Sequence, residues 1–149
     1  MPGNEVWFED VPSGTVIESQ DRDISEDDLI NYNKITRSVG ATHNDAAEAQ
    51  KYGFKERLVP GPFILAAALP LHHRTGEHKV LALLGIDGLR FKAPVHPGDR
   101  IRLRSEIKSA RDSSKPDRGV VVIEEKVLNQ RDEVVMEHTR SVLWAKRPC

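Results

Sequence analysis

The residues best suited to chemistry in this sequence are a histidine in a polar, glycine-containing loop and a glycine that opens an apolar segment. His43 can act as a general base or acid, because an imidazole gains and loses a proton near neutral pH. Gly61 lies between two prolines, at the start of a run of apolar residues. A helix beginning there presents free backbone N–H groups and a positive dipole end, suited to holding an oxyanion. Because Pro62 has no N–H, the donor must be Gly61 itself or Phe63 and beyond.

Three helices are expected to position these residues. An acidic run directly after Ser25 predicts a capped helix start, and this helix ends near Arg37. A second helix is expected over about 45–52. The third, over 61–73, is apolar on every side until Pro70 kinks or ends it. A helix without a polar face has to be surrounded by protein.

The second half of the chain changes to a period of two, which is typical of strands. The expected strands are Thr15–Ser25, Val80–Pro94, Arg100–Ala110, Gly119–Leu128 and Val134–Trp144. They predict a single α+β domain over 1–149 in which an antiparallel sheet wraps around a buried central helix. Such a sheet has edge strands to cover, so we expect a homodimer or a heteromer with another chain of the same fold.

Composition excludes several classes of protein. The chain has 149 residues, 38% hydrophobic and 30% charged, which is typical of a globular domain. Its net charge of −1 argues against nucleic-acid binding. No apolar run reaches the roughly 18 residues that span a bilayer, and no signal-peptide pattern is visible. The only cysteine is Cys149, which excludes a disulfide framework and favours a reduced cytoplasm.

The other histidines are expected to have no catalytic role. His72 and His73 are adjacent, so on a helix they point to different faces and make a poor metal pair. We therefore predict no metal. His78, His96 and His138 lie in polar stretches and are expected to be solvated.

Several stretches resemble the MaoC-like dehydratase family, the (R)-specific enoyl-CoA hydratases with a hot-dog fold. Thr36 to Gly61 fit the family's active-site segment without a gap, with His43 on the motif histidine and Gly61 on the motif glycine. The resemblance continues in Phe8-Glu9-Asp10-Val11, Leu89-Arg90-Phe91, Pro97-Gly98-Asp99 and Val127-Leu128-Asn129-Gln130. It implies a hot-dog fold and an acyl-CoA thioester substrate, with coenzyme A as part of the substrate and no separate cofactor.

The sequence departs from the family at the residue that should share a bound water with the histidine. In the family that residue is an aspartate, and here it is Ser38. The asparagine two positions later is Gly40, and the histidine before the motif glycine is Pro60. A serine hydroxyl can position a water but cannot take its proton at neutral pH.

No single acid replaces the missing aspartate in the sequence. Asp45 is the nearest to His43, but its position before the second helix favours a capping role. Asp21, Asp23 or an acid from a second subunit stay open as substitutes. For the acyl group, we expect contacts from Phe54, Phe63 and Pro60, since a proline before Gly61 stiffens the mouth of the pocket.

Three functions remain open at this point. The first is a hydratase or dehydratase that adds water to a trans-2-enoyl-CoA or removes it, with His43 as acid/base, Gly61 as oxyanion donor and Ser38 placing the water. The second is a non-catalytic or partner-dependent subunit that binds acyl-CoA. The third is an acyl-CoA thioesterase in which Ser38 is the nucleophile.

Overall fold

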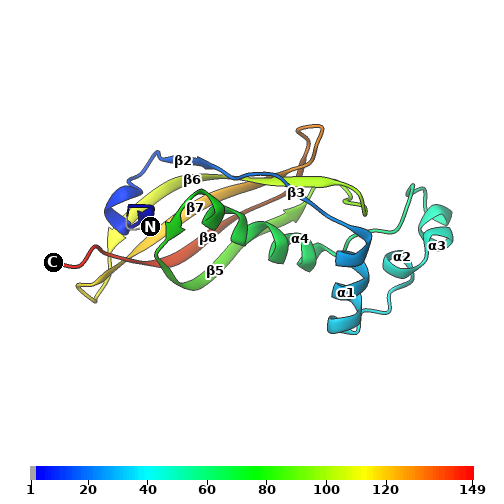
Figure 1. Cartoon of the computed structure of the whole chain (residues 1–149), viewed down its shortest axis with the longest axis horizontal. Coiled ribbons are helices and arrows are strands. Elements are labelled where there is room, and N and C mark those ends of the chain that lie inside the picture. Colours follow the sequence, from blue (N-terminus) through cyan, green and yellow to red (C-terminus); the bar gives the residue numbers. More distant parts are fainter. Residues whose placement is uncertain (1–2) are drawn as a thin grey trace.

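The computed structural model describes residues 3–149, without the side chain of Arg74. Its largest element is a sheet with the strand order β2-β6-β7-β8-β5, and neighbouring strands are antiparallel throughout (Figure 1). The strands are β2 (Val16–Glu18), β5 (Val80–Phe91), β6 (Arg100–Asp112), β7 (Arg118–Leu128) and β8 (Val134–Ala145). The four long strands confirm the predictions from period two to within a few residues at each end.

The helices fall into two groups (Figure 1). The central helix α4 (Gly61–Ala68) lies along one face of the sheet and continues as a 3-10 segment, η2 (Leu69–Thr75). Three helices gather at one end of the molecule: α1 (Glu26–Thr36), α2 (Ala41–Asn44) and α3 (Ala46–Lys51). At the opposite end, a 3-10 segment η1 (Phe8–Asp10) lies near a small parallel pair of strands, β1 (Glu5–Val6) and β4 (Glu77–His78). The predicted kink at Pro70 is confirmed by the change from α to 3-10 geometry.

The expected opening strand is interrupted. Glu18 of β2 pairs with Arg104, whereas Arg22 of β3 (Arg22–Asp23) pairs with Ile101, so this segment has one more residue than the strand it faces. Ser19 sits in the gap, and its hydroxyl accepts a hydrogen bond from the Leu103 N–H at 2.7 Å. An extra residue of this kind bends a strand and ends regular pairing.

The capping residues confirm two helix starts. The Ser25 hydroxyl accepts from the Asp28 N–H, and the Asp28 carboxylate accepts from the Ser25 N–H, each at 3.0 Å. The Asp45 carboxylate caps α3 by accepting from the N–H groups of Ala47 and Glu48 at 2.8 and 3.3 Å. The polar loop expected around His43, over residues 38–44, is wrong in part, because its second half forms the short helix α2.

The central helix is covered by this chain on one side only. Phe63, Ile64, Ala67 and Ala68 face the sheet and are buried in the larger core cluster. Pro62 and Ala66 on the other side are exposed. Within one chain, the sheet therefore covers one side of this all-apolar helix, and the other side stays exposed.

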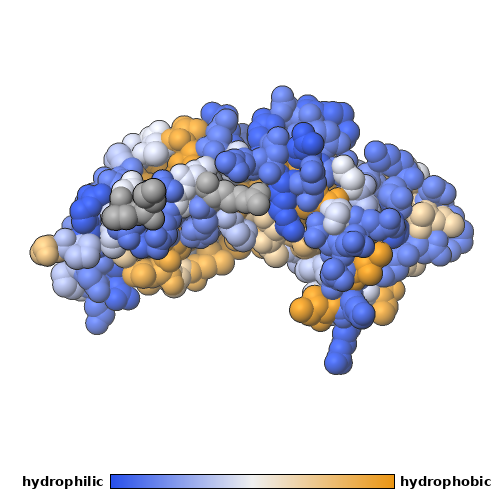
Figure 2. All heavy atoms as spheres, viewed as in Figure 1, coloured by the Kyte–Doolittle hydropathy of each residue, from blue (hydrophilic) through white to orange (hydrophobic). Residues whose placement is uncertain are grey.

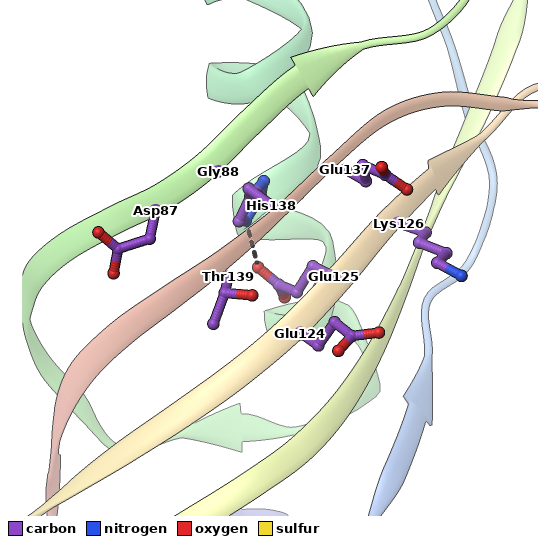
Figure 3. Close-up of a pocket in the computed structure, with 8 residues that line it drawn as sticks. All are labelled: Asp87, Gly88, Glu124, Glu125, Lys126, Glu137, His138 and Thr139. Carbon is purple, nitrogen blue, oxygen red and sulfur yellow. Dashed lines mark hydrogen bonds and ion pairs between the residues drawn. The ribbon is translucent and has the colours of Figure 1, made fainter.

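Four polar side chains interrupt the apolar face of the sheet: Ser105, Glu125, His138 and Arg140. We call them the charged layer. Glu125 is fully buried and accepts hydrogen bonds from the other three, with the bond from His138 Nε2 at 2.9 Å drawn in Figure 3. The charged layer separates the two apolar core clusters and satisfies both oxygens of its carboxylate.

The expectation that His78, His96 and His138 are solvated is wrong, since all three are at most 6% exposed. Each has a hydrogen-bonding partner that a polar stretch of sequence does not reveal. His138 donates to Glu125 at 2.9 Å, and Nδ1 of His96 contacts the Arg57 carbonyl at 2.9 Å. His78 Nε2 lies 3.1 Å from the Thr75 hydroxyl.

The charged layer reaches the end of the central helix through His72. Arg140 Nη2 donates to His72 Nδ1 at 3.2 Å, which requires a neutral imidazole. Burial lowers the pKa of His72 to about 3, with a further contribution from the charge of Arg140. Burial likewise lowers the pKa of His78 to about 4. In Glu125, the hydrogen bonds and the charge of Arg140 outweigh burial and hold the pKa well below its usual range.

These pKa values predict that acid destabilises the protein. Unfolded histidines bind protons near pH 6.5, but folded His72 and His78 do not until about pH 3 and 4. The free energy of unfolding therefore falls as the pH drops below 6.5, by ~2 kcal/mol per histidine at pH 5. Glu125 adds a further loss below its unfolded pKa of about 4.5. Urea unfolding at pH 7.5 and at pH 5 measures this decrease in the free energy of unfolding.

The control for this prediction is His78→Gln, which removes one titrating group. Its free energy of unfolding should depend less steeply on pH between 7.5 and 5 than that of the unchanged protein. An equal slope in the two proteins, or no slope in either, contradicts the assignment of neutral buried histidines.

Candidate active site

His43 and Gly61 line one cavity of about 480 Å³, which we call the His43 cavity. Its wall is formed by the loop before α4, the first turn of α4, and the end of β5 with the segment that follows it. Most of the lining is apolar and includes Phe54, Leu58 and Ile64. An apolar cavity with one imidazole and one helix N-terminus matches the constellation expected from the sequence.

The hydrogen bond made by His43 determines its tautomer. Nδ1 lies 2.7 Å from the Leu58 carbonyl oxygen, which can only accept. Nδ1 therefore carries the proton, and Nε2 carries the lone pair. This is the form of imidazole that acts as a general base through Nε2.

The segment that carries His43 is braced by two asparagines that the sequence analysis did not identify. Asn33 is buried on the inner face of α1 and donates to the His43 carbonyl at 3.0 Å and to Asn44 Oδ1 at 3.3 Å. Asn44 Nδ2 in turn donates to the carbonyls of Ser38 and Gly40 at 3.1 and 2.8 Å. The signal in the sequence was an asparagine four residues after Leu29, on the face of the helix that packs inward.

Gly61 provides an available donor at the start of α4. The N–H groups of Phe63 and Ile64 both donate to the Pro60 carbonyl, at 2.9 and 3.2 Å, and Pro62 has no N–H. Among the described residues, the Gly61 N–H has no acceptor. The first turn of α4 therefore offers this N–H to a ligand in the His43 cavity.

Ser38 lies in a different hollow. It lines a space of about 620 Å³ between α1 and α2, and His43 is the residue that this space shares with the His43 cavity. The Ser38 backbone is held by Asn33 and Asn44, while its hydroxyl makes no hydrogen bond to His43 in the described part of the chain. His43 thus stands between Ser38 and Gly61.

The other expected site residues are divided between cavity and core. Phe54 lines the His43 cavity. Pro60 is buried directly before the helix and is not part of the lining. Phe63 packs in the core with its ring stacked on Tyr32, the centroids 4.7 Å apart, and does not line the cavity. Ile64 and Phe91 line it instead.

No carboxylate among residues 3–149 lines either hollow. Asp45 caps α3, as expected, and Asp23 pairs with Arg100 at 2.9 Å. The described side chains also form no group of three or more acidic, histidine or cysteine residues that could hold a metal ion. None of the helices in this part of the chain is long and apolar enough to cross a membrane.

A third hollow, of about 270 Å³, lies on the sheet face that points away from α4 (Figure 3). Glu125 and His138 of the charged layer border it. The rest of its lining includes Asp87, Glu124, Lys126 and Glu137. They alternate along their strands with residues that face the core, so this surface is the polar side of the sheet. It contains no exposed helix N-terminus, and we do not assign the chemistry to it.

A sheet that wraps a central helix defines the hot-dog class of fold, and solved structures confirm it. A protein of Mycobacterium tuberculosis described as having a double hot-dog fold superposes with a TM-score of 0.87 at 20% identity, over 99% of this chain and 46% of its own. A protein described as a monoamine oxidase regulatory protein from Archaeoglobus fulgius gives a TM-score of 0.87 at 30% identity over 99% of both chains.

Sequence comparison identifies the family within this class. A model of the MaoC-like domain matches residues 8–129, and the chain therefore belongs to the MaoC-like domain family. The β-methylmalyl-CoA dehydratase of Chloroflexus aurantiacus is 31% identical over 147 residues, or 98% of this chain. The chain spans only 41% of the length of that dehydratase.

The bracing role of Asn33 is testable by Asn33→Ala. The substitution removes two hydrogen bonds from a buried position, so the free energy of unfolding should fall by about 1–3 kcal/mol. Amide hydrogen exchange in residues 38–44 should accelerate as the segment loosens. Asn31→Ala, on the exposed side of the same helix, is the matched control and should change neither quantity. If amide hydrogen exchange in residues 38–44 stays as slow in Asn33→Ala as in the unchanged protein, Asn33 does not brace this segment.

Proposed function

We propose that this chain hydrates a trans-2-enoyl-CoA, or dehydrates the corresponding 3-hydroxyacyl-CoA. The observation that carries the proposal is the shared cavity of His43 and Gly61, one with a free imidazole lone pair and the other with a free N–H. Membership of the MaoC-like family and the dehydratase activity of the Chloroflexus relative support the same reaction class.

In this mechanism, the Gly61 N–H donates a hydrogen bond to the thioester oxygen. That bond stabilises the enolate that forms when water adds to the third carbon of the acyl chain. His43 Nε2 removes a proton from the attacking water, and the proton is delivered to the second carbon as the enolate collapses. In the reverse direction, the same imidazole takes the proton from the second carbon and then returns it to the departing hydroxyl, which leaves as water.

The mechanism differs from that of the family in using one titratable group. Because no carboxylate among residues 3–149 lines either hollow, His43 acts alone on the water, and the hydroxyl of Ser38 in the neighbouring hollow cannot take its proton. General base catalysis contributes on the order of 10²–10⁴-fold, so one base supports turnover at a reduced rate.

The test is hydration of crotonyl-CoA by the purified protein, followed through loss of the conjugated enoyl-thioester absorbance. His43→Ala should lower kcat by at least about 10²-fold, because the general base is gone. His73→Ala is the matched control, since His73 lies outside both hollows, and it should leave kcat unchanged. Equal rates for His43→Ala and the unchanged protein would exclude the mechanism.

A second variant distinguishes between two functions of this chain, a catalytic hydratase and a non-catalytic acyl-CoA-binding subunit. The observation behind the second function is the missing carboxylate. A chain without it would bind acyl-CoA and depend for turnover on a partner chain with a complete catalytic site. Ser38→Asp should raise kcat if the unchanged protein is already a slow hydratase. A silent unchanged protein that becomes active as Ser38→Asp would instead establish the binding subunit. Release of free coenzyme A in the same reaction would reveal a thioesterase. The described residues disfavour it, because the Ser38 hydroxyl makes no hydrogen bond to His43 and the Nδ1 of His43 is bonded to the Leu58 carbonyl.

We further propose that two copies associate along β5. This strand is an outer strand of the sheet, and Leu81, Leu83 and Leu84 on it are each about half exposed. The exposed side of α4 adjoins it, and apolar side chains gather along this flank of the molecule (Figure 2). A free edge with apolar residues on both faces needs a cover, and a second copy supplies one.

Light scattering after gel filtration tests the association. Leu83→Glu should convert a dimer into monomers, because it places a charge in the apolar contact. Val16→Glu, at the opposite edge of the sheet and 48% exposed, is the matched control and should leave the dimer intact. A dimer that survives Leu83→Glu, or a protein that is monomeric from the start, contradicts the arrangement.

A further inference from the structure

The hollow beside Ser38, which we call the Ser38 hollow, is lined by cations and by no carboxylate among the described residues. Lys34 and Arg37 come from the end of α1, and Arg57 comes from the loop before α4. The guanidinium of Arg57 is already paired with two carboxylates, at 2.5 and 2.9 Å. Lys34 and Arg37 form no ion pair within residues 3–149 as described. The Ser38 hollow therefore offers two positive charges to an anionic ligand.

The same hollow is lined by a buried acceptor that lacks a donor. Asn33 is 6% exposed, and its Nδ2 donates to the His43 carbonyl and to Asn44 Oδ1. Both partners can only accept, so the orientation of the amide is fixed. Asn33 Oδ1 receives no hydrogen bond from the described residues. Because a buried acceptor without a donor is costly, a ligand with a hydroxyl group next to its anionic group matches this lining.

The position of His43 determines which part of a substrate reaches the Ser38 hollow. Gly61 lines only the His43 cavity, the two free cations line only the Ser38 hollow, and His43 lines both. The inference rests on the proposed function, in which Gly61 holds the thioester oxygen and His43 acts on the water that adds to the third carbon. An acyl chain that runs from Gly61 past His43 therefore directs its fourth carbon into the Ser38 hollow.

We propose that the preferred substrate is the thioester of a dicarboxylic acid, whose free carboxylate at the fourth carbon is bound by Lys34 and Arg37. Charge-assisted hydrogen bonds from these side chains are stronger than those between neutral groups, and a guanidinium can bind a carboxylate through two of them. Hydration places a hydroxyl group on the third carbon, next to the carboxylate, where Asn33 Oδ1 can accept from it. The cation of the His43 cavity, Lys92, is instead paired with Glu137 at 3.3 Å.

The selectivity is measured with fumaryl-CoA and crotonyl-CoA, which share a four-carbon enoyl skeleton and end in a carboxylate or a methyl group. The unchanged protein should hydrate fumaryl-CoA with the higher kcat/KM. Replacing both cations, Lys34→Gln with Arg37→Gln, should lower the ratio of fumaryl to crotonyl kcat/KM at least about tenfold, since a hydrogen bond between charged groups is worth this much. Lys55→Gln removes an exposed cation outside both hollows and should leave the ratio unchanged.

Two results overturn the proposal. One is an unchanged protein that hydrates crotonyl-CoA as well as fumaryl-CoA or better. The other is a double variant that loses the same factor with both thioesters, because the cations would then bind the phosphates of coenzyme A, which the two probes share.

The carboxylate site is also measured without turnover, by calorimetric binding of succinyl-CoA and butyryl-CoA, the saturated counterparts of the two probes. The unchanged protein should bind succinyl-CoA more tightly, and the difference should shrink at high salt and in the double variant. If neither enoyl thioester is hydrated, the proposed reaction fails and this comparison alone decides the site. Equal affinities of the unchanged protein for the two saturated thioesters overturn the proposal.

Discussion

The helix α4 imposes the constraint on which the rest of the molecule depends. Eight residues without a polar side chain cannot remain in water, and the N–H of their first residue, Gly61, has no acceptor within residues 3–149 as described. The long strands cover one side of this helix with the inward residues of β6, β7 and β8. Burial of the helix body and exposure of its N-terminus are therefore produced by one arrangement, in which the sheet curls around the helix but leaves its first turn open to a cavity.

The charged layer serves this arrangement from within the core. A buried carboxylate is costly unless its oxygens are satisfied, and Glu125 receives hydrogen bonds from three side chains. Arg140 joins that carboxylate to His72, which lies just beyond the end of α4. Because the strands on either side are held by ladder hydrogen bonds, the layer ties the C-terminal end of the helix to the sheet while the N-terminal end carries the site.

Much of the fold could be predicted from the sequence because it depends on local periodicity. The inward positions of β6 alternate as Ile101, Leu103 and Ile107, and all three are buried as that pattern requires. The helix caps at Ser25 and Asp45 follow from hydrogen bonds within three residues of the cap. These features involve neighbours along the chain, so no knowledge of the tertiary arrangement was needed.

The buried histidines could not be predicted in this way, since their partners are distant in the sequence. His138 and Glu125 lie on adjacent strands, and His72 meets Arg140 only after the chain has crossed the sheet. One signal was nevertheless present. Ser105, Glu125 and His138 each occupy an inward position in a run of alternating apolar residues, and such interruptions at matching positions indicate a polar layer.

The site shows the same division between local and distant information. Position 43 follows from a motif, but its Nδ1–H bond to the Leu58 carbonyl, which sets the tautomer, joins residues that are 15 apart. The bracing by Asn33 and the gathering of Lys34, Arg37 and Arg57 around one hollow also depend on folding.

Among the described residues, no carboxylate lines the His43 cavity, and this has a further consequence for the chemistry. The His43 imidazole shares the cavity with a mostly apolar wall, the Gly61 N–H and one cationic side chain, Lys92. A neutral imidazole can start the addition of water by taking a proton at Nε2, but no carboxylate in the described lining stabilises the cation that it becomes. The developing positive charge must then be balanced by the enolate held at Gly61, so the two ends of the cavity act on one transition state.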